Sequence, residues 1–276
     1  MFLTRLASLI RSSLPLSLFV VTSMLGISLS GCSSSPSRSA DGTEVVEPKS
    51  PRERAQLLIE AANGSLLEND PIGSLQFLER AEKLDPKYAP IYHAKALAFS
   101  VRKDFPAALT EMKKAVDLDP ENPFALNTYG KFLLDAGRLD EAEAPLSKAG
   151  ANPVFREAYK ANSNLGILYY RKSDFDRSEK SFQKAINDDA ANSCIAYYYL
   201  GHIAVRRNQL PDAEKFYERA TQKQCAAFAD AHLALGMMYE RRKKTEEARK
   251  KYLELKQNFP DSKASESAME RLKHLP

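Results

Sequence analysis

From Ala55 to the C-terminus, small residues return in a fixed pattern along an otherwise mixed apolar and polar chain. The first set recurs at intervals of 34, 34, 36, 35 and 35 positions and consists of Ala62, Ala96, Gly130, Gly166, Gly201 and Gly236. Twelve positions later stands a second set, Ser74, Ala108, Ala142, Ser178, Ala213 and Ala248. Larger side chains at such positions would push two packed helices apart. The pattern therefore predicts six pairs of closely packed helices.

Proline and short polar turns mark the ends of these predicted helices. Proline cannot continue the helical hydrogen-bond ladder, and it disfavours helical geometry in the residue before it. The predicted second helices end at Pro86, Pro120, Pro153 and Pro260, whereas repeats four and five carry Ala190 and Cys225 instead. The boundaries after repeats four and five are therefore predicted less sharply than the others.

The period and the small residues resemble the tetratricopeptide repeat, which pairs two antiparallel helices in each unit. The resemblance implies an all-α fold, a right-handed superhelical solenoid in a single domain over residues 54–276. We place the six repeats at about 55–88, 89–122, 123–157, 158–192, 193–227 and 228–261. Residues 262–276 are predicted to form a capping helix, because an open solenoid otherwise exposes its last stacking face.

The N-terminus has the features of a secretory signal. Arg5 and Arg11 precede an apolar run over residues 14–29, which ends in Leu-Ser-Gly-Cys at residues 29–32. At roughly sixteen residues, this run is shorter than the roughly twenty that span a bilayer. The tetrapeptide resembles a bacterial lipobox. That resemblance implies removal of residues 1–31 and a covalent lipid on Cys32.

The segment after Cys32 is predicted to be a flexible tether. Residues 33–53 are rich in Ser and Pro and show no apolar period, so they cannot bury enough surface to offset the entropy of ordering. By resemblance to other lipoproteins, Ser33 and Ser34 after the cysteine favour the outer membrane, with the folded part facing the periplasm. The formal net charge of +4 falls to +2 when Arg5 and Arg11 leave with the signal, which removes the electrostatic basis for nucleic-acid binding.

The sequence holds little that suggests catalysis. Its four histidines, His93, His202, His232 and His274, are far apart and show no metal-binding spacing. No glycine-rich phosphate loop is present. We therefore expect no enzymatic activity, no metal, no small-molecule substrate and no cofactor apart from the lipid on Cys32.

Cys194 and Cys225 are the two thiols that remain once Cys32 is acylated. They lie at the two ends of the helix pair of repeat five, and an antiparallel hairpin brings its two ends together. An exported protein sits where disulfides persist. Two readings stay open at this point, a disulfide between them and a pair of buried free cysteines.

In tetratricopeptide proteins the first helix of each pair lines the concave face, so the resemblance indicates where a partner would bind. Aromatic, amide and basic groups on that face suit an extended peptide. The candidate groove residues are Phe124, Asn127, Lys131, Lys160, Ser163, Ile167, Tyr170, Arg171, Ile195, Tyr198, His202, Arg206, Met237 and Arg241. Some of these side chains are also expected simply to cover the space between neighbouring helices.

The lipobox, the tether and six such repeats together resemble the type IV pilus pilotins, the PilF, PilW and Tgl family. The resemblance is carried by residues 119–142 and by the Asn-Pro junction that leads to Ala161-Asn-Ser-Asn-Leu-Gly166. It implies a non-enzymatic outer-membrane lipoprotein that binds secretin subunits and aids their assembly. Two alternatives remain. The first is a scaffold for another envelope assembly system, because residues 258–264 resemble the tails of proteins that assemble the outer membrane or act with Tol-Pal. The second is a regulatory subunit of an envelope enzyme such as a peptidoglycan synthase.

Overall fold

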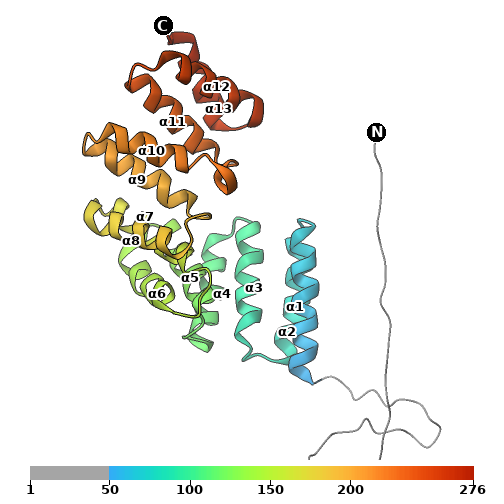
Figure 1. Ribbon diagram of the computed structural model, residues 1–276. Helices are drawn as coiled ribbons and strands as arrows, with labels where there is room; N and C mark the ends of the chain where they lie inside the picture. The colour runs from blue at the N-terminus through green and yellow to red at the C-terminus, as the bar shows by residue number, and fades with distance from the viewer. Residues whose placement is uncertain (1–49) are drawn as a thin grey trace, which may run out of the picture. The chain divides into compact units, whose positions relative to one another are not determined.

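The computed structural model describes residues 50–276, which form thirteen α-helices and one short 3-10 helix and contain no β-strand (Figure 1). The all-α solenoid that the sequence predicts is thereby confirmed. The predicted signal at 1–31, Cys32 and the tether up to residue 49 lie outside the described residues and stay predictions. Within residues 50–276, none of the helices combines the length and apolar character needed to cross a membrane.

Twelve of the helices form six antiparallel pairs, one in each predicted repeat. The first helices are α1 (Pro51–Leu67), α3 (Ala89–Val101), α5 (Pro123–Asp135), α7 (Ala158–Arg171), α9 (Cys194–Arg206) and α11 (Ala229–Arg241). The second helices are α2 (Pro71–Leu84), α4 (Phe105–Leu118), α6 (Leu139–Ala151), α8 (Phe175–Asp188), α10 (Leu210–Arg219) and α12 (Thr245–Asn258). Helix α13 (Lys263–His274) follows at the predicted cap, and the 3-10 helix η1 covers Lys223–Cys225.

Helix α1 begins earlier than the sequence reading placed it, so residues 51–53 belong to the solenoid and not to the tether. Ser50 is the N-cap, and its hydroxyl accepts a hydrogen bond from the Glu53 amide at 3.2 Å. The Glu53 carboxylate in turn accepts one from the Ser50 amide at 2.6 Å. This capping box, with Pro51 in the first turn, satisfies amides that the helix itself leaves unpaired.

Each pair is held together by a small residue on its first helix and a large one sixteen positions later on its second. A Cβ atom added at Gly166, Gly201 or Gly236 would overlap a ring of the second helix. The six large partners are all buried, and they are Leu78, Met112, Leu146, Phe182, Tyr217 and Tyr252. Rings occur only opposite glycine, because the missing Cβ leaves the room that a ring needs.

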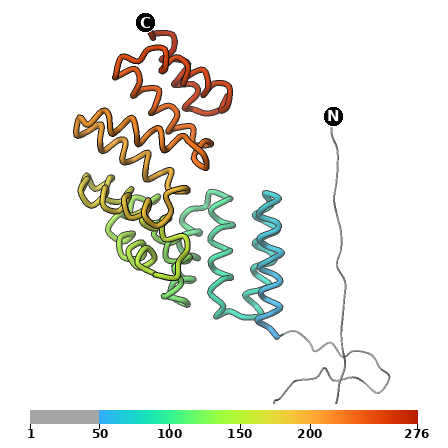
Figure 2. Tube along the Cα trace, in the orientation of Figure 1, coloured from blue at the N-terminus to red at the C-terminus, as the bar shows by residue number. Residues whose placement is uncertain are grey.

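The pairs stack in chain order, as the trace shows (Figure 2). Every second helix packs against the first helix of the next repeat, and α12 packs against α13. The core is accordingly a row of small apolar clusters, each shared by neighbouring repeats. Stability in such a solenoid depends on contacts between neighbours in sequence.

Repeat five departs from the others at its second helix. Helix α10 has ten residues, whereas the other second helices have thirteen or fourteen. Beyond it, η1 brings Cys225 to the start of α9, where it forms a disulfide bond with Cys194. At the other junction without proline, the Asp189 carboxylate accepts hydrogen bonds from the amides of Ala191 and Asn192 and so ends α8.

Candidate protein-binding surface

The fourteen candidate groove residues all lie on the first helices α5, α7, α9 and α11, but only part of the set is accessible. Ser163 is 5% exposed, so its side chain is not part of a surface. The equivalent positions in repeats three and five carry the longer side chains Asn127 and Tyr198. Eight of the fourteen are exposed, namely Phe124, Lys131, Lys160, Arg171, Ile195, Arg206, Met237 and Arg241.

Three polar groove residues already have partners within the chain. The Nδ2 of Asn164 donates to the Oδ1 of Asn127 at 3.0 Å, which ties α7 to α5. Lys131 pairs with Asp135 at 2.5 Å, and Lys160 pairs with Glu157 on the turn before its own helix. The two ion pairs are solvent-exposed and therefore weak, so both lysines can exchange partners at little cost.

Three ring-bearing groove residues, Tyr170, Tyr198 and His202, belong to a cluster of rings that joins repeats four and five. Tyr198 lies 4.4 Å from His202 between ring centroids, and Tyr170 lies 5.0 Å from Tyr199. Burial raises the pKa of Tyr198 to about 12 and lowers the pKa of His202. Rings in edge contact at these distances stabilise packing. The main role of the rings at this joint is therefore to stabilise the packing of neighbouring repeats.

Two arginines of the set also support the joints between repeats. A guanidinium nitrogen of Arg171 donates to the carbonyl oxygen of Leu134 at 2.7 Å. The guanidinium of Arg206 lies over the ring of Phe175, 4.8 Å from its centroid. Four groove residues are accessible and have no hydrogen bond from the side chain and no ion pair within residues 50–276, and they are Phe124, Ile195, Met237 and Arg241. The groove that the sequence indicates is thus reduced to scattered contact points.

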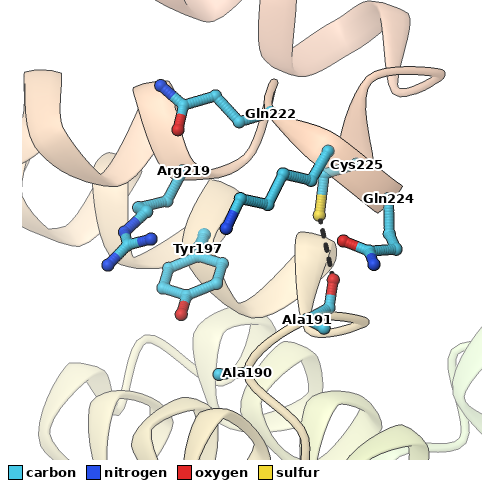
Figure 3. A pocket seen from close by; sticks show the side chains of 8 residues that line it. Ala190, Ala191, Tyr197, Arg219, Gln222, Gln224 and Cys225 are labelled. Atoms are coloured by element: carbon cyan, nitrogen blue, oxygen red, sulfur yellow. Dashed lines mark hydrogen bonds between the residues drawn. The ribbon is translucent and has the colours of Figure 1, made fainter.

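A pocket of about 270 Å³ lies beside Cys225, one half of the disulfide. Figure 3 shows the side chains that line it. Arg219 and Lys223 line it together with Tyr197, and the Sγ of Cys225 lies 3.7 Å from the carbonyl oxygen of Ala191. The disulfide therefore fixes the loop that shapes this pocket. It is a feature of repeat five that the sequence reading did not anticipate.

Sequence reasoning also missed a larger and mainly apolar pocket of about 590 Å³ at the turn ends of α3, α4 and α5. Of the predicted groove residues only Lys131 lines it. A signal was present in the sequence, because Val101 and Phe105 flank a turn where repeats four to six have an arginine before the turn. The common repeat pattern does not include these positions, so it gives no indication that apolar residues replace the arginine in repeat two.

Comparisons with known proteins agree with the repeat architecture. One family described as Tetratricopeptide repeat matches residues 163–227 and 198–263, and a second with the same description matches residues 102–162. The chain therefore belongs to the tetratricopeptide-repeat proteins. Such proteins are generally non-enzymatic scaffolds, and these matches indicate no catalytic family.

Among tetratricopeptide-repeat proteins, the chain is similar to type IV pilus proteins. It is 26% identical over 163 residues to the type IV pilus assembly protein PilF of Pseudomonas aeruginosa, a match that covers 59% of this chain and 63% of PilF. The structure of Pseudomonas aeruginosa PilF matches with a TM-score of 0.69 at 21% identity, covering 80% of this chain and 99% of that one.

The structure of PilW, described as a widely conserved type IV pilus biogenesis factor, has the same fold. It matches with a TM-score of 0.69 at 22% identity and covers 78% of this chain and 98% of that one. A shorter sequence match, 30% identical over 93 residues, is to the STIP1 homolog of Dictyostelium discoideum and covers 32% of this chain and 16% of that protein.

Proposed function

We propose that this chain is a lipid-anchored protein-binding scaffold that acts in type IV pilus biogenesis, as a pilotin-like factor for secretin subunits. The observation that carries the proposal is the sequence match to PilF, which extends over more than half of this chain. The shared solenoid fold of PilF and PilW supports it. The lipobox at residues 29–32, which the pilotin resemblance includes, supports it as well.

In this proposal the lipid and the solenoid have separate tasks. The lipid on Cys32 holds the protein at the outer membrane, and attachment through more than one acyl chain makes detachment slow. The tether lets the repeats reach a partner in the periplasm. Exposed apolar groove residues such as Phe124, Ile195 and Met237 supply contact area, since such side chains gain most from burial at an interface.

Deletion of the gene tests this function directly. We expect secretin multimers to disappear from outer-membrane fractions, and monomers to accumulate, when heat-resistant multimers are separated on gels. The wild-type chain should restore them. A Cys32→Ala chain should restore them poorly although it is present at normal levels, because it lacks the anchor.

Normal secretin multimers in the deletion strain would refute the pilotin role. A defect in another envelope assembly instead would favour the alternative scaffold function, for example one connected with the Tol-Pal system or peptidoglycan synthesis. Comparing both phenotypes in one strain separates the two.

A further inference from the structure

The joints between neighbouring repeats are closed by basic residues in the C-terminal half of the solenoid. At the joint of repeats four and five, Arg207 bridges Asp176 at 2.8 Å and Glu179 at 2.5 Å. The equivalent Lys172 bridges Asp140 and Glu143 one repeat earlier, at 2.7 and 3.0 Å. One repeat later, Arg242 and Lys244 both pair with Glu214.

The joint of repeats two and three lacks this closure. Ala136 stands at the position of Arg207, and Pro106 and Leu109 stand where Asp176 and Glu179 stand two repeats later. No ion pair links α4 to α5 at these positions, and the space is the pocket of about 590 Å³. This joint thus has small and apolar groups where the later joints have charged ones, and they line an apolar niche.

The same niche is filled by large side chains between repeats four and five. There the Tyr170 ring lies 5.5 Å from the ring of Phe175, and the Arg206 guanidinium covers the same ring. Phe105 is the equivalent of Phe175, but Ser100 stands in place of Tyr170 and Asp135 in place of Arg206. Phe105 accordingly remains 60% exposed.

The apolar character continues along the turn edge, which we define as the ends of the helices next to the turns within repeats. Leu67 is 90% exposed, Ile72 61% and Val101 44%. The residues equivalent to Leu67 and Val101 in the four later repeats are Asp135, Arg171, Arg206 and Arg241. Several exposed apolar side chains at one edge are typical of an interaction site, and at the turn edge these side chains belong to repeats one and two.

We propose that the pocket at Phe105 binds an aromatic side chain presented by a partner polypeptide. The chain itself indicates this occupant, because a tyrosine ring fills the equivalent niche between repeats four and five. Leu109 and Phe132 offer apolar walls, and the concave shape suits one bulky anchor. The proposal deepens the proposed scaffold function and rests on it, since it gives the partner's chemistry and its place on the solenoid.

The charges around the pocket favour a protein over a lipid surface. Lys131 at its rim is neutralised by Asp135, and the carboxylate of Asp104 caps α4 beside it. Asp70 caps α2 at the corresponding place in repeat one. An anionic membrane attracts clusters of basic residues. At the turn edge of repeats one to three, Arg102, Lys103 and Lys131 instead stand among carboxylates, namely Glu68, Asp70, Asp104 and Asp135.

A photo-reactive residue tests the contact in the full chain within its own cells. We would place p-benzoyl-phenylalanine at Phe105 and, as a matched control, at Leu253, which is 49% exposed on α12. Irradiation should link position 105 to a protein segment that contains an aromatic residue, identified by mass spectrometry, whereas position 253 should not link to that segment. Links to lipid, or equal links from both positions, would overturn the proposal.

The linked segment is then made as a synthetic peptide, and its affinity for the purified protein is measured. Because the chain contains no tryptophan, binding of a tryptophan-labelled peptide is visible by fluorescence. Ser100→Tyr with Asp135→Arg should fill the niche as repeats four and five do. Leu109→Glu with Ala136→Arg should close it with an ion pair. Each pair, and loss of the peptide's aromatic residue, should weaken binding at least about tenfold, or about 1.4 kcal/mol.

We call both double substitutions filled variants, and circular dichroism and thermal melting show whether they fold. Each introduces residues that the chain already has at the equivalent positions two repeats later. Unchanged binding in a folded filled variant would refute the pocket proposal. The outcome is independent of the pilotin role. If the deletion strain loses its secretin multimers and a filled variant restores them, the pilotin role stands and the pocket proposal is refuted. If the deletion strain keeps normal multimers but position 105 links to an aromatic segment, the pocket proposal stands and the pilotin role is refuted.

Discussion

At the residue scale, the matched sizes of paired residues determine how closely two helices of a repeat approach. Gly201 faces the ring of Tyr217, whereas the two N-terminal repeats pair Ala62 with Leu78 and Ala96 with Met112. A methyl group and a flexible side chain occupy the space that a hydrogen and a ring occupy in repeats four to six. Repeat three pairs Gly130 with Leu146, so a glycine also tolerates a flexible partner. The combination that does not occur in the six repeats is alanine opposite a ring.

Gly201→Ala is expected to destabilise the fold by about 1 to 3 kcal/mol, because the new methyl group overlaps the Tyr217 ring. Urea unfolding measures the change. Adding Tyr217→Met should recover part of the loss, because methionine opposes alanine in repeat two. If the two substitutions are simply additive in free energy, the proposed complementarity is wrong.

The six turns within repeats each place one residue in the left-handed region. These residues are Asn69, Lys103, Gly137, Ser173, Asn208 and Lys243, with φ between 59° and 75°. Only one of them is glycine, although the conformation costs other residues roughly 1 kcal/mol.

Ser173→Gly should therefore stabilise the protein slightly, by up to about 1 kcal/mol, since glycine adopts φ near 60° without steric cost. Gly137→Ala should destabilise it by a similar amount. Thermal melting compares the two. A lower melting temperature for Ser173→Gly would show that the entropy of the unfolded chain outweighs the turn.

At the element scale, repeat five replaces helix with a covalent bond. Helix α10 stops at Arg219, and the disulfide between Cys194 and Cys225 holds the following loop against the start of α9. In other repeats the last turn of the second helix makes this contact. The bond thus secures a junction that has neither proline nor a full-length helix.

Reduction should destabilise the protein by about 3 to 4 kcal/mol in the chain-entropy account, because the bond closes a loop with a sequence separation of 31. Melting with and without reductant measures this. Hydrogen exchange should show the largest loss of protection in α10 and η1. The variant Cys194→Ser with Cys225→Ser serves as the control, and its melting should not respond to reductant.

At the scale of the whole molecule, three buried or half-buried histidines couple folding to pH. Burial lowers the pKa of His93, His202 and His232 below the ordinary value of 6.5. The Nε2 of His232 also lies 2.9 Å from the carbonyl oxygen of Ala226, to which the neutral ring can donate. The folded chain therefore binds fewer protons than the unfolded chain when the pH drops below 6.5.

Stability should accordingly be complete above about pH 7 and fall as the pH decreases from there toward 5. Urea unfolding at several pH values measures this slope. Replacing all three histidines with glutamine should flatten it. A free energy of unfolding that increases as the pH decreases from 7 to 5 would contradict the role of the buried histidines. Further loss below pH 4.5 is expected from Glu143 and Glu214, whose pKa values are lowered by their basic partners.

Much of the fold was predictable because each repeat is specified locally. The spacing of Ala62, Gly130 and Gly201 indicates helix pairs, since close packing depends on side-chain size at fixed helical positions. Helix ends at prolines were predictable for a similar reason. The start of α1 at Pro51 was missed, because the capping box there was read as part of a polar tether.

The candidate surface was predictable only in outline. Periodicity places Tyr170 and Tyr198 on the first helices, but it does not show that neighbouring rings enclose them. The pocket at Phe105 depends on Ser100, Leu109 and Asp135, which lie on three different helices. Whether such side chains fill a space together depends on how the helices meet.

The sequence by itself determined the repeat, the number of helix pairs and the positions at which they touch, because these follow from short-range spacing and residue size. Only the tertiary structure decided which exposed positions remain free. Ion pairs and rings close the joints of repeats three to six, while the joint at Phe105 stays open. Closure is a property of groups from neighbouring repeats acting together, so no single repeat contains it.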